Sequence, residues 1–162
     1  MIPVHSVLVV CAANICRSPS AAELLATLLR EQGSRIVVES AGVTAVGDRP
    51  ACDLALSLVG HATTRRYAFE GTEDVSSHAG SHRSRRITST DIETADVIVV
   101  MEQWHADEVL ALAPDADVRL LDPSGDIPDP HAIGYESHAA VFGRLRAAVA
   151  VVADELAGEK SD

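Results

Sequence analysis

The chain has 162 residues, of which 47% are hydrophobic, 23% charged and 3% aromatic, a composition that fits one compact globular domain and excludes a large multidomain protein and a disordered chain. Its 13 Lys and Arg residues stand against 24 Asp and Glu residues, which gives a formal charge of -11. Such a charge repels phosphate-rich polymers and anionic lipid surfaces, so neither nucleic acid nor a membrane is expected as a partner.

Four short apolar runs rich in β-branched residues predict the strands of a parallel sheet, because strands buried on both faces read as continuous apolar segments. The runs cover residues 6–10, 36–40, 97–101 and 118–121. Helical stretches lie between them, and this alternation predicts an α/β fold with helices on both faces of the sheet.

Two helices have clear sequence patterns. After the first strand, Pro19 in a first turn is followed by apolar residues at helical spacing, and Gly33 is the expected end. The last segment has apolar residues every three or four positions, at Phe142, Leu145, Val149, Val152 and Leu156. We expect one domain over residues 1–158 and a flexible tail over 159–162.

The middle of the chain is less regular. Residues 50–59 predict a short helix that carries Cys52, and residues 60–81 predict a long surface loop. The three cysteines are an odd number without a C-x-x-C pair, which is not a disulfide framework. Since no charged start precedes the first apolar run either, we expect a soluble cytoplasmic protein in which at least one thiol is functional.

The loop after the first strand has the parts of an anion site. Residues 10–19 read VCAANICRSP, and a strand that leads directly into a helix leaves several backbone N–H groups unpaired. The helix N-terminus and Arg17 would stabilise a thiolate on Cys11, which makes Cys11 a candidate nucleophile. Arg17 can also present a planar pair of donors to two phosphate oxygens. The C-x5-R-S spacing therefore predicts a loop that binds a tetrahedral dianion.

These ten residues resemble the signature of the low-molecular-weight protein tyrosine phosphatases, V-C-x-G-N-x-C-R-S-P. The resemblance implies that Cys11 attacks phosphorus to form a cysteinyl-phosphate, that Arg17 binds the phosphoryl oxygens and that Ser18 stabilises the Cys11 thiolate. It further implies a three-layer sandwich with strand order 2-1-3-4. The phosphate-binding loop would consist of Ala12, Ala13, Asn14, Ile15, Cys16, Arg17 and Ser18.

Ala13 departs from the family signature, which has glycine at this position. If the position requires a positive φ, alanine there would cost about 1 kcal/mol or more. We therefore expect activity only if alanine fits the loop conformation at this position.

A general acid is needed as well, because a thiolate that attacks phosphorus must expel an alkoxide or phenoxide, and protonating the leaving oxygen is worth about 10² to 10⁴ in rate. Residues 126–130, DIPDP, lie between the fourth strand and the last helix. The family carries its acid in an Asp-Pro pair at this place, which implies Asp129, with Asp126 as the alternative. His131 follows where the family usually has an aromatic residue that lines the cleft.

Three shorter motifs extend the resemblance over most of the chain, at residues 40–42, 82–85 and 95–102. By family pattern, Ser40 and His82 would join Asn14 in a hydrogen-bond network that holds the loop in its anion-binding shape.

No metal is expected. His78 and His82 are four residues apart, but the sequence places no further ligands around them. Trp104 and His105, directly after the third strand, are interpreted as cap and packing residues.

The predicted function is metal-independent hydrolysis of a phosphomonoester, phosphotyrosine on a protein, by a monomer or weak dimer without a cofactor. Three alternatives remain. A protein arginine phosphatase would by family pattern have a small polar residue in place of Ile15, and an arsenate reductase would need more redox cysteines than Cys52. The third is a non-catalytic phosphate-binding regulatory module.

Oxidation is expected to be reversible. A sulfenic acid on Cys11 would condense with Cys16 in an intraloop disulfide, while Cys52, in the middle helix, would take no part.

Overall fold

The computed structural model describes residues 3–53, 82–132 and 135–159. Within them lies a four-stranded parallel sheet of order β2-β1-β3-β4, as predicted. Its strands are β1 (Ser6–Cys11), β2 (Val37–Gly42), β3 (Val97–Val100) and β4 (Val118–Leu120). β1 and β2 continue one and two residues past their predicted ends, because they stay paired up to Cys11 and Gly42, whereas β3 and β4 each end one residue early.

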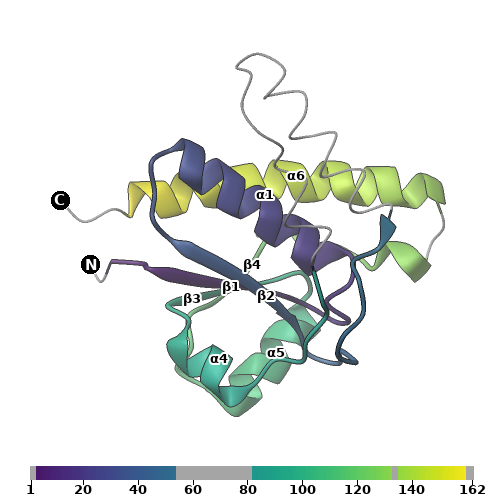
Figure 1. Cartoon of the computed structure of the whole chain (residues 1–162), viewed down its shortest axis with the longest axis horizontal. Coiled ribbons are helices and arrows are strands. Elements are labelled where there is room, and N and C mark those ends of the chain that lie inside the picture. Colours follow the sequence, from purple (N-terminus) through teal and green to yellow (C-terminus); the bar gives the residue numbers. More distant parts are fainter. Residues whose placement is uncertain (1–2, 54–81, 133–134, 160–162) are drawn as a thin grey trace.

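Helices cover both faces of this sheet, which confirms the three-layer α/β sandwich (Figure 1). The helices α1 (Arg17–Glu31) and α6 (Tyr135–Gly158) lie together on one face, and α4 (Ser89–Thr94) and α5 (Gln103–Leu112) lie on the other. A short 3₁₀ helix, η1 (Pro130–Ala132), precedes α6.

Alternation along the strands divides the core between the two layers. Val7, Val9 and Cys11 of β1 pack into the cluster beneath α1 and α6, whereas Leu8 and Val10 pack into the cluster beneath α4 and α5. Because successive side chains of a strand point to opposite faces, one continuous apolar run supplies both cores.

The two long helices follow their predicted patterns. α1 ends at Glu31, and Gly33 adopts a φ of 72° just beyond it, a backbone conformation that favours glycine. In α6, Phe142, Leu145 and Val149 are almost fully buried against the sheet.

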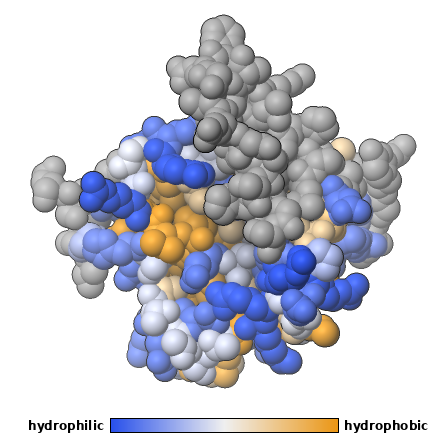
Figure 2. Space-filling view, viewed as in Figure 1, coloured by the Kyte–Doolittle hydropathy of each residue, from blue (hydrophilic) through white to orange (hydrophobic). Residues whose placement is uncertain are grey.

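Parts of the sequence interpretation fall outside the described residues. They are the predicted helix beyond residue 53, the loop predicted over residues 60–81 and His78. In the described part of the chain, no helix is long and apolar enough to cross a membrane. Hydrophilic side chains dominate the face drawn in Figure 2, with a narrower apolar strip between them.

Candidate active site

The loop between β1 and α1 lies at the carboxyl edge of the sheet, where open parallel sheets bind their ligands. The Cys11 side chain is 2% exposed, and its Sγ lies 3.1 Å from the Ser18 Oγ. The backbone N–H of Asn14 donates to the same sulfur over 3.3 Å. Two polar groups therefore face the Cys11 sulfur, and both can stabilise negative charge on it.

Asn14 is the centre of the network that holds this loop. Its Nδ2 donates to the Ser18 Oγ over 2.9 Å and to the Ser40 Oγ over 3.0 Å. Its Oδ1 accepts from the backbone N–H of Arg85 over 2.9 Å. The backbone carbonyl of Asn14 lies 2.8 Å from the His82 Nε2, which must carry a proton to donate to it. The structure thus brings Asn14, Ser18, Ser40 and His82 together.

The left-handed residue of the loop is Asn14, with a φ of 55°, and not Ala13. Asparagine tolerates this conformation better than other residues with a side chain. Ala13 therefore carries no positive-φ penalty.

Glycine is required instead at Gly42, the last residue of β2. A Cβ placed there would lie 2.4 Å from the carbonyl oxygen of Ala12 and 2.9 Å from the backbone nitrogen of Asn14. The N–H groups of the next two residues, Val43 and Thr44, donate to the carbonyls of Cys11 and Ala12. The end of β2 therefore supports the loop by direct backbone contact.

Arg17 begins α1 and is 3% exposed. Its NH1 donates to the Glu102 Oε1 and, over 2.8 Å, to the carbonyl of Ile127. Its NH2 lies 3.9 Å from the Asp129 Oδ2. The guanidinium is thus fixed on one side and directed toward the acidic loop on the other.

Glu102 was not singled out from the sequence as a site residue. Its position directly after β3, at the carboxyl edge where the loops converge, is the signal that could have identified it.

His105 is more than a packing residue, because it lies behind the Arg17 and Glu102 pair. Its ring is fully buried, and Nδ1 accepts from the backbone N–H of Glu102 over 3.1 Å. Nε2 lies 3.8 Å from the Glu102 Oε1 and makes no hydrogen bond within the described residues. Burial and the neighbouring Arg17 charge lower the pKa of His105 to about 4. A neutral His105 therefore supports Glu102 at neutral pH.

The two candidate acids have different environments. The Asp126 Oδ1 accepts from the backbone N–H of Gln103 at the start of α5, over 2.8 Å. Asp129 is 46% exposed, and its Oδ1 accepts from the backbone N–H of His131 over 3.0 Å. Asp126 thus accepts a hydrogen bond at the start of α5, whereas Asp129 faces Arg17.

Arg144 of α6 fastens the loop that carries these acids. Its guanidinium donates to the carbonyls of Gly125 and Asp126 and to the Asp122 carboxylate. Hydrogen bonds from Ser124 and from Arg144 lower the pKa of Asp122 to about 2, so Asp122 is a carboxylate at neutral pH.

A second group of side chains lies beside the loop, and it corrects the interpretation of Cys52. Cys52 was predicted to lie within a helix over residues 50–59, but the structure assigns no helix at Cys52 itself. Its thiol lies within 4.8 Å of both the Cys16 Sγ and the His131 Nε2. A hydrogen bond with Cys52, together with burial, raises the pKa of the Cys16 thiol. Cys52 therefore contacts the loop, contrary to the expectation from its position in the sequence.

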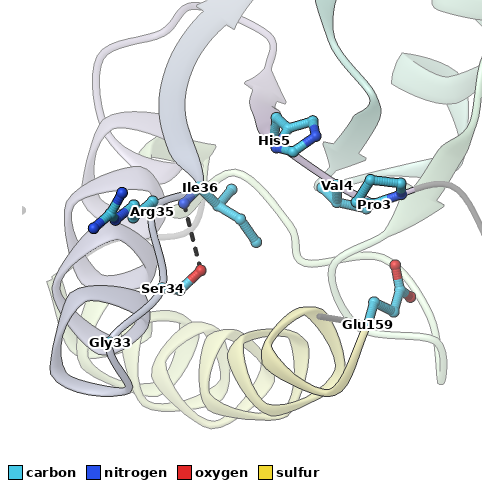
Figure 3. Close-up of a pocket in the computed structure, with 8 residues that line it drawn as sticks. All are labelled: Pro3, Val4, His5, Gly33, Ser34, Arg35, Ile36 and Glu159. Atoms are coloured by element: carbon cyan, nitrogen blue, oxygen red, sulfur yellow. Dashed lines mark hydrogen bonds between the residues drawn. The ribbon is translucent and has the colours of Figure 1, made fainter. Parts of the chain in front are cut away.

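A pocket of about 340 Å³ lies elsewhere, at the amino end of the sheet. It is lined by residues that precede β1 and β2 and by Glu159 (Figure 3). The cysteine loop and the acids follow the opposite, carboxyl ends of the strands, so this pocket is separate from the candidate active site.

The chain is similar to known proteins over most of its length. A family model described as low molecular weight phosphotyrosine protein phosphatase matches residues 6–162. The low molecular weight protein-tyrosine-phosphatase Wzb of Escherichia coli (strain K12) is 31% identical over 146 residues, which are 87% of this chain and 88% of Wzb.

Solved structures are similar over nearly the whole chain. The tyrosine phosphatase Wzb from Escherichia coli K30 in complex with sulphate has a TM-score of 0.76 and 30% identity, and the match covers 94% of this chain and 99% of that one. The YwlE arginine phosphatase from Geobacillus stearothermophilus has a TM-score of 0.74 and 28% identity, over 96% of this chain and 94% of that one.

Proposed function

This chain belongs to the low molecular weight phosphotyrosine protein phosphatase family, and on that premise we propose that it hydrolyses phosphotyrosine on protein substrates through a cysteinyl-phosphate. One observation carries the proposal. A buried thiol on Cys11, the guanidinium of Arg17 and the carboxyl group of Asp129 converge at the carboxyl edge of the sheet.

In the first step, the Cys11 thiolate attacks phosphorus, and the bond between phosphorus and the leaving oxygen breaks. Asp129 donates a proton to that oxygen, so that a phenol departs instead of a phenoxide. Arg17 is already bound at NH1, so a phosphoryl group would be bound through NH2 and Nε.

In the second step, the Asp129 carboxylate takes a proton from water as the water oxygen attacks phosphorus. The bond between sulfur and phosphorus breaks, inorganic phosphate leaves and the Cys11 thiolate is restored. Arg17 stabilises the charge that develops on the phosphoryl oxygens in both steps.

The Ser18 hydroxyl has one proton to donate and two possible acceptors. It accepts from the Asn14 Nδ2 and lies 3.3 Å from the Ala41 carbonyl and 3.1 Å from the Cys11 sulfur. We infer that it donates to the carbonyl while Cys11 is a thiol and turns to the sulfur when Cys11 is a thiolate. This rotation stabilises both the nucleophile and the leaving thiolate.

The test compares turnover of a phosphotyrosine peptide, a phosphoarginine peptide and para-nitrophenyl phosphate. We expect the phosphotyrosine peptide to be preferred, and Cys11→Ser to bind phosphate but abolish turnover. A preference for the phosphoarginine peptide would instead assign this chain the kind of activity for which the YwlE arginine phosphatase is named. No turnover above the Cys11→Ser control would indicate a phosphate-binding module.

Further properties belong to the same proposal. We place a single domain at residues 1–158 and locate the protein in the cytoplasm, since its nucleophile is a thiol that must stay reduced. Hydrogen peroxide would oxidise Cys11 to a sulfenic acid, which Cys16 would convert to a disulfide with loss of water. Thiols would then restore activity.

A further inference from the structure

Cys16, Cys52 and His131 come from three separate parts of the chain and meet beside the phosphate-binding loop. Each offers one ligand atom, and the three atoms lie within 4.8 Å of one another. The Cys16 Sγ and the His131 Nε2 are 2.9 Å apart. We propose that these residues bind a zinc ion, and that the bound ion inhibits the phosphatase.

The separations suit a tetrahedral ion. With zinc–sulfur bonds of about 2.3 Å and zinc–nitrogen bonds of about 2.0 Å, two sulfurs lie about 3.8 Å apart and a sulfur and a nitrogen about 3.5 Å apart. The Cys16 sulfur and the His131 nitrogen would thus separate by well under 1 Å. A small adjustment of the three side chains is therefore enough to form the site, and the backbone need not change.

The backbone already holds each ligand in place. Cys16 is the N-cap of α1. The N–H of Cys52 donates to the carbonyl of Ile15 over 3.0 Å, and the N–H of His131 donates to Asp129. Because the three positions are anchored before the ion arrives, binding requires little ordering of the chain.

The donor set favours zinc over magnesium or calcium. Two thiolates and one imidazole are soft or borderline ligands, whereas magnesium and calcium prefer oxygen. Binding replaces the protons of the two thiols, so two protons are released for each ion when both thiols start protonated. Cys16 is buried and His131 is exposed, so an ion can enter from solvent on the His131 side. A water molecule or the Asp129 carboxylate would complete the tetrahedron.

Inhibition rests on the proposed function, because the ion would connect the phosphate-binding loop to the loop that carries Asp129. Cys16 belongs to the phosphate-binding loop, and His131 lies two residues after Asp129. An ion shared by both would fix the acid loop against the cysteine loop and restrain the carboxyl group that must protonate the leaving oxygen. Filling of the site and loss of turnover should therefore have the same zinc dependence.

Cobalt(II) is the spectroscopic probe, because it occupies zinc sites and shows a charge-transfer band when thiolates bind it. The reduced full-length protein is titrated with cobalt after the reductant is removed, and zinc is then added to displace the cobalt. We expect one ion per chain and a thiolate band that zinc abolishes. Cys52→Ser and His131→Ala should each weaken binding by at least about 10-fold.

Two matched variants act as controls, and circular dichroism verifies that every variant is folded. His5→Ala removes an exposed histidine from a distant part of the chain, and Cys11→Ser removes the nucleophile. Both should keep the wild-type cobalt affinity. An absent thiolate band, or a band that survives in Cys52→Ser and disappears in Cys11→Ser, would overturn the site.

Turnover of para-nitrophenyl phosphate is measured in parallel. Zinc should inhibit the wild-type protein at the concentrations that fill the site, and Cys52→Ser should need at least about 10-fold more zinc for the same inhibition. Equal inhibition of both proteins would overturn the link to catalysis. Since cobalt binding needs no turnover, an inactive wild-type protein that binds cobalt would refute the proposed function and leave the metal site standing.

Discussion

Replacement of Asn14 tests how the phosphate-binding loop keeps its shape. The side chain is fully buried and makes three hydrogen bonds, to Ser18, Ser40 and the backbone of Arg85. Each is worth about 1 kcal/mol. Asn14→Gly removes them while accepting the φ of 55°, and should lower the free energy of unfolding by about 3 kcal/mol. Asn14→Ala adds at least about 1 kcal/mol of left-handed strain, for a loss of about 4 kcal/mol.

Asp48 provides the matched control. It is the other described non-glycine residue with a positive φ, 66°, but its side chain is 90% exposed. Asp48→Ala should therefore cost only the backbone strain of about 1 kcal/mol.

Urea unfolding gives the free energies, and kcat/KM for para-nitrophenyl phosphate reports the loop geometry. We expect a loss of about 100-fold in kcat/KM for both Asn14 variants, because a displaced donor or nucleophile loses its alignment, and little change for Asp48→Ala. Asn14→Gly within about 0.5 kcal/mol of the wild type would refute the role of the network, since additivity errors are of that size. Equal losses in Asn14→Ala and Asp48→Ala would show that the backbone alone accounts for the effect.

Three further predictions concern the acid, the buried histidine and the glycine contact. Asp129→Asn should slow a poor leaving group far more than para-nitrophenolate, whereas Asp126→Asn, which alters a helix start, should lower the melting temperature and spare this ratio; the reverse pattern would exchange the roles. His105 has a folded pKa of about 4 against 6.5 unfolded, so below pH 6.5 the unfolded chain binds the extra proton and stability falls, by up to about 3 kcal/mol near pH 4. His105→Asn should remove that part of the pH dependence in urea titrations. Gly42→Ala should reduce kcat/KM by at least about 100-fold, while Gly143→Ala, where an added Cβ meets nothing within 4 Å, should leave it unchanged.

The sequence predicted the centre of the sheet because β1 and β3 are apolar and buried on both faces, whereas the edge strands β2 and β4 are partly exposed. The short length and β-branched residues of runs such as 97–101 favour a buried strand, and the strand order follows from the family resemblance. The sequence predicted which residues hold the loop, but it did not predict which atoms of these residues form the hydrogen bonds. Nothing in the signature indicates that Asn14, rather than residue 13, takes the left-handed conformation.

Long-range contacts at the site escaped prediction for a physical reason. Glu102 ends the 95–102 motif and Cys52 stands in no motif, but the contacts of both with the cysteine loop exist only because the fold brings them there. Their partners are separated from them by many residues and have no periodic relation to them. Such pairs can be predicted only when the strand order and the place where the chain leaves each strand are known.

The attachment of the acid loop to α6 determines the order in which parts of the site can form during synthesis. Synthesis proceeds from the N-terminus, so β1, the cysteine loop and α1 leave the ribosome long before Arg144, whose guanidinium holds the carbonyls of Gly125 and Asp126. Under the proposed mechanism, the nascent chain contains Cys11 well before the loop that carries Asp129 is attached to α6. A chain arrested ahead of α6 would lack Phe142, Leu145 and Val149 of the core beneath α1, so the site is completed only when the last helix docks.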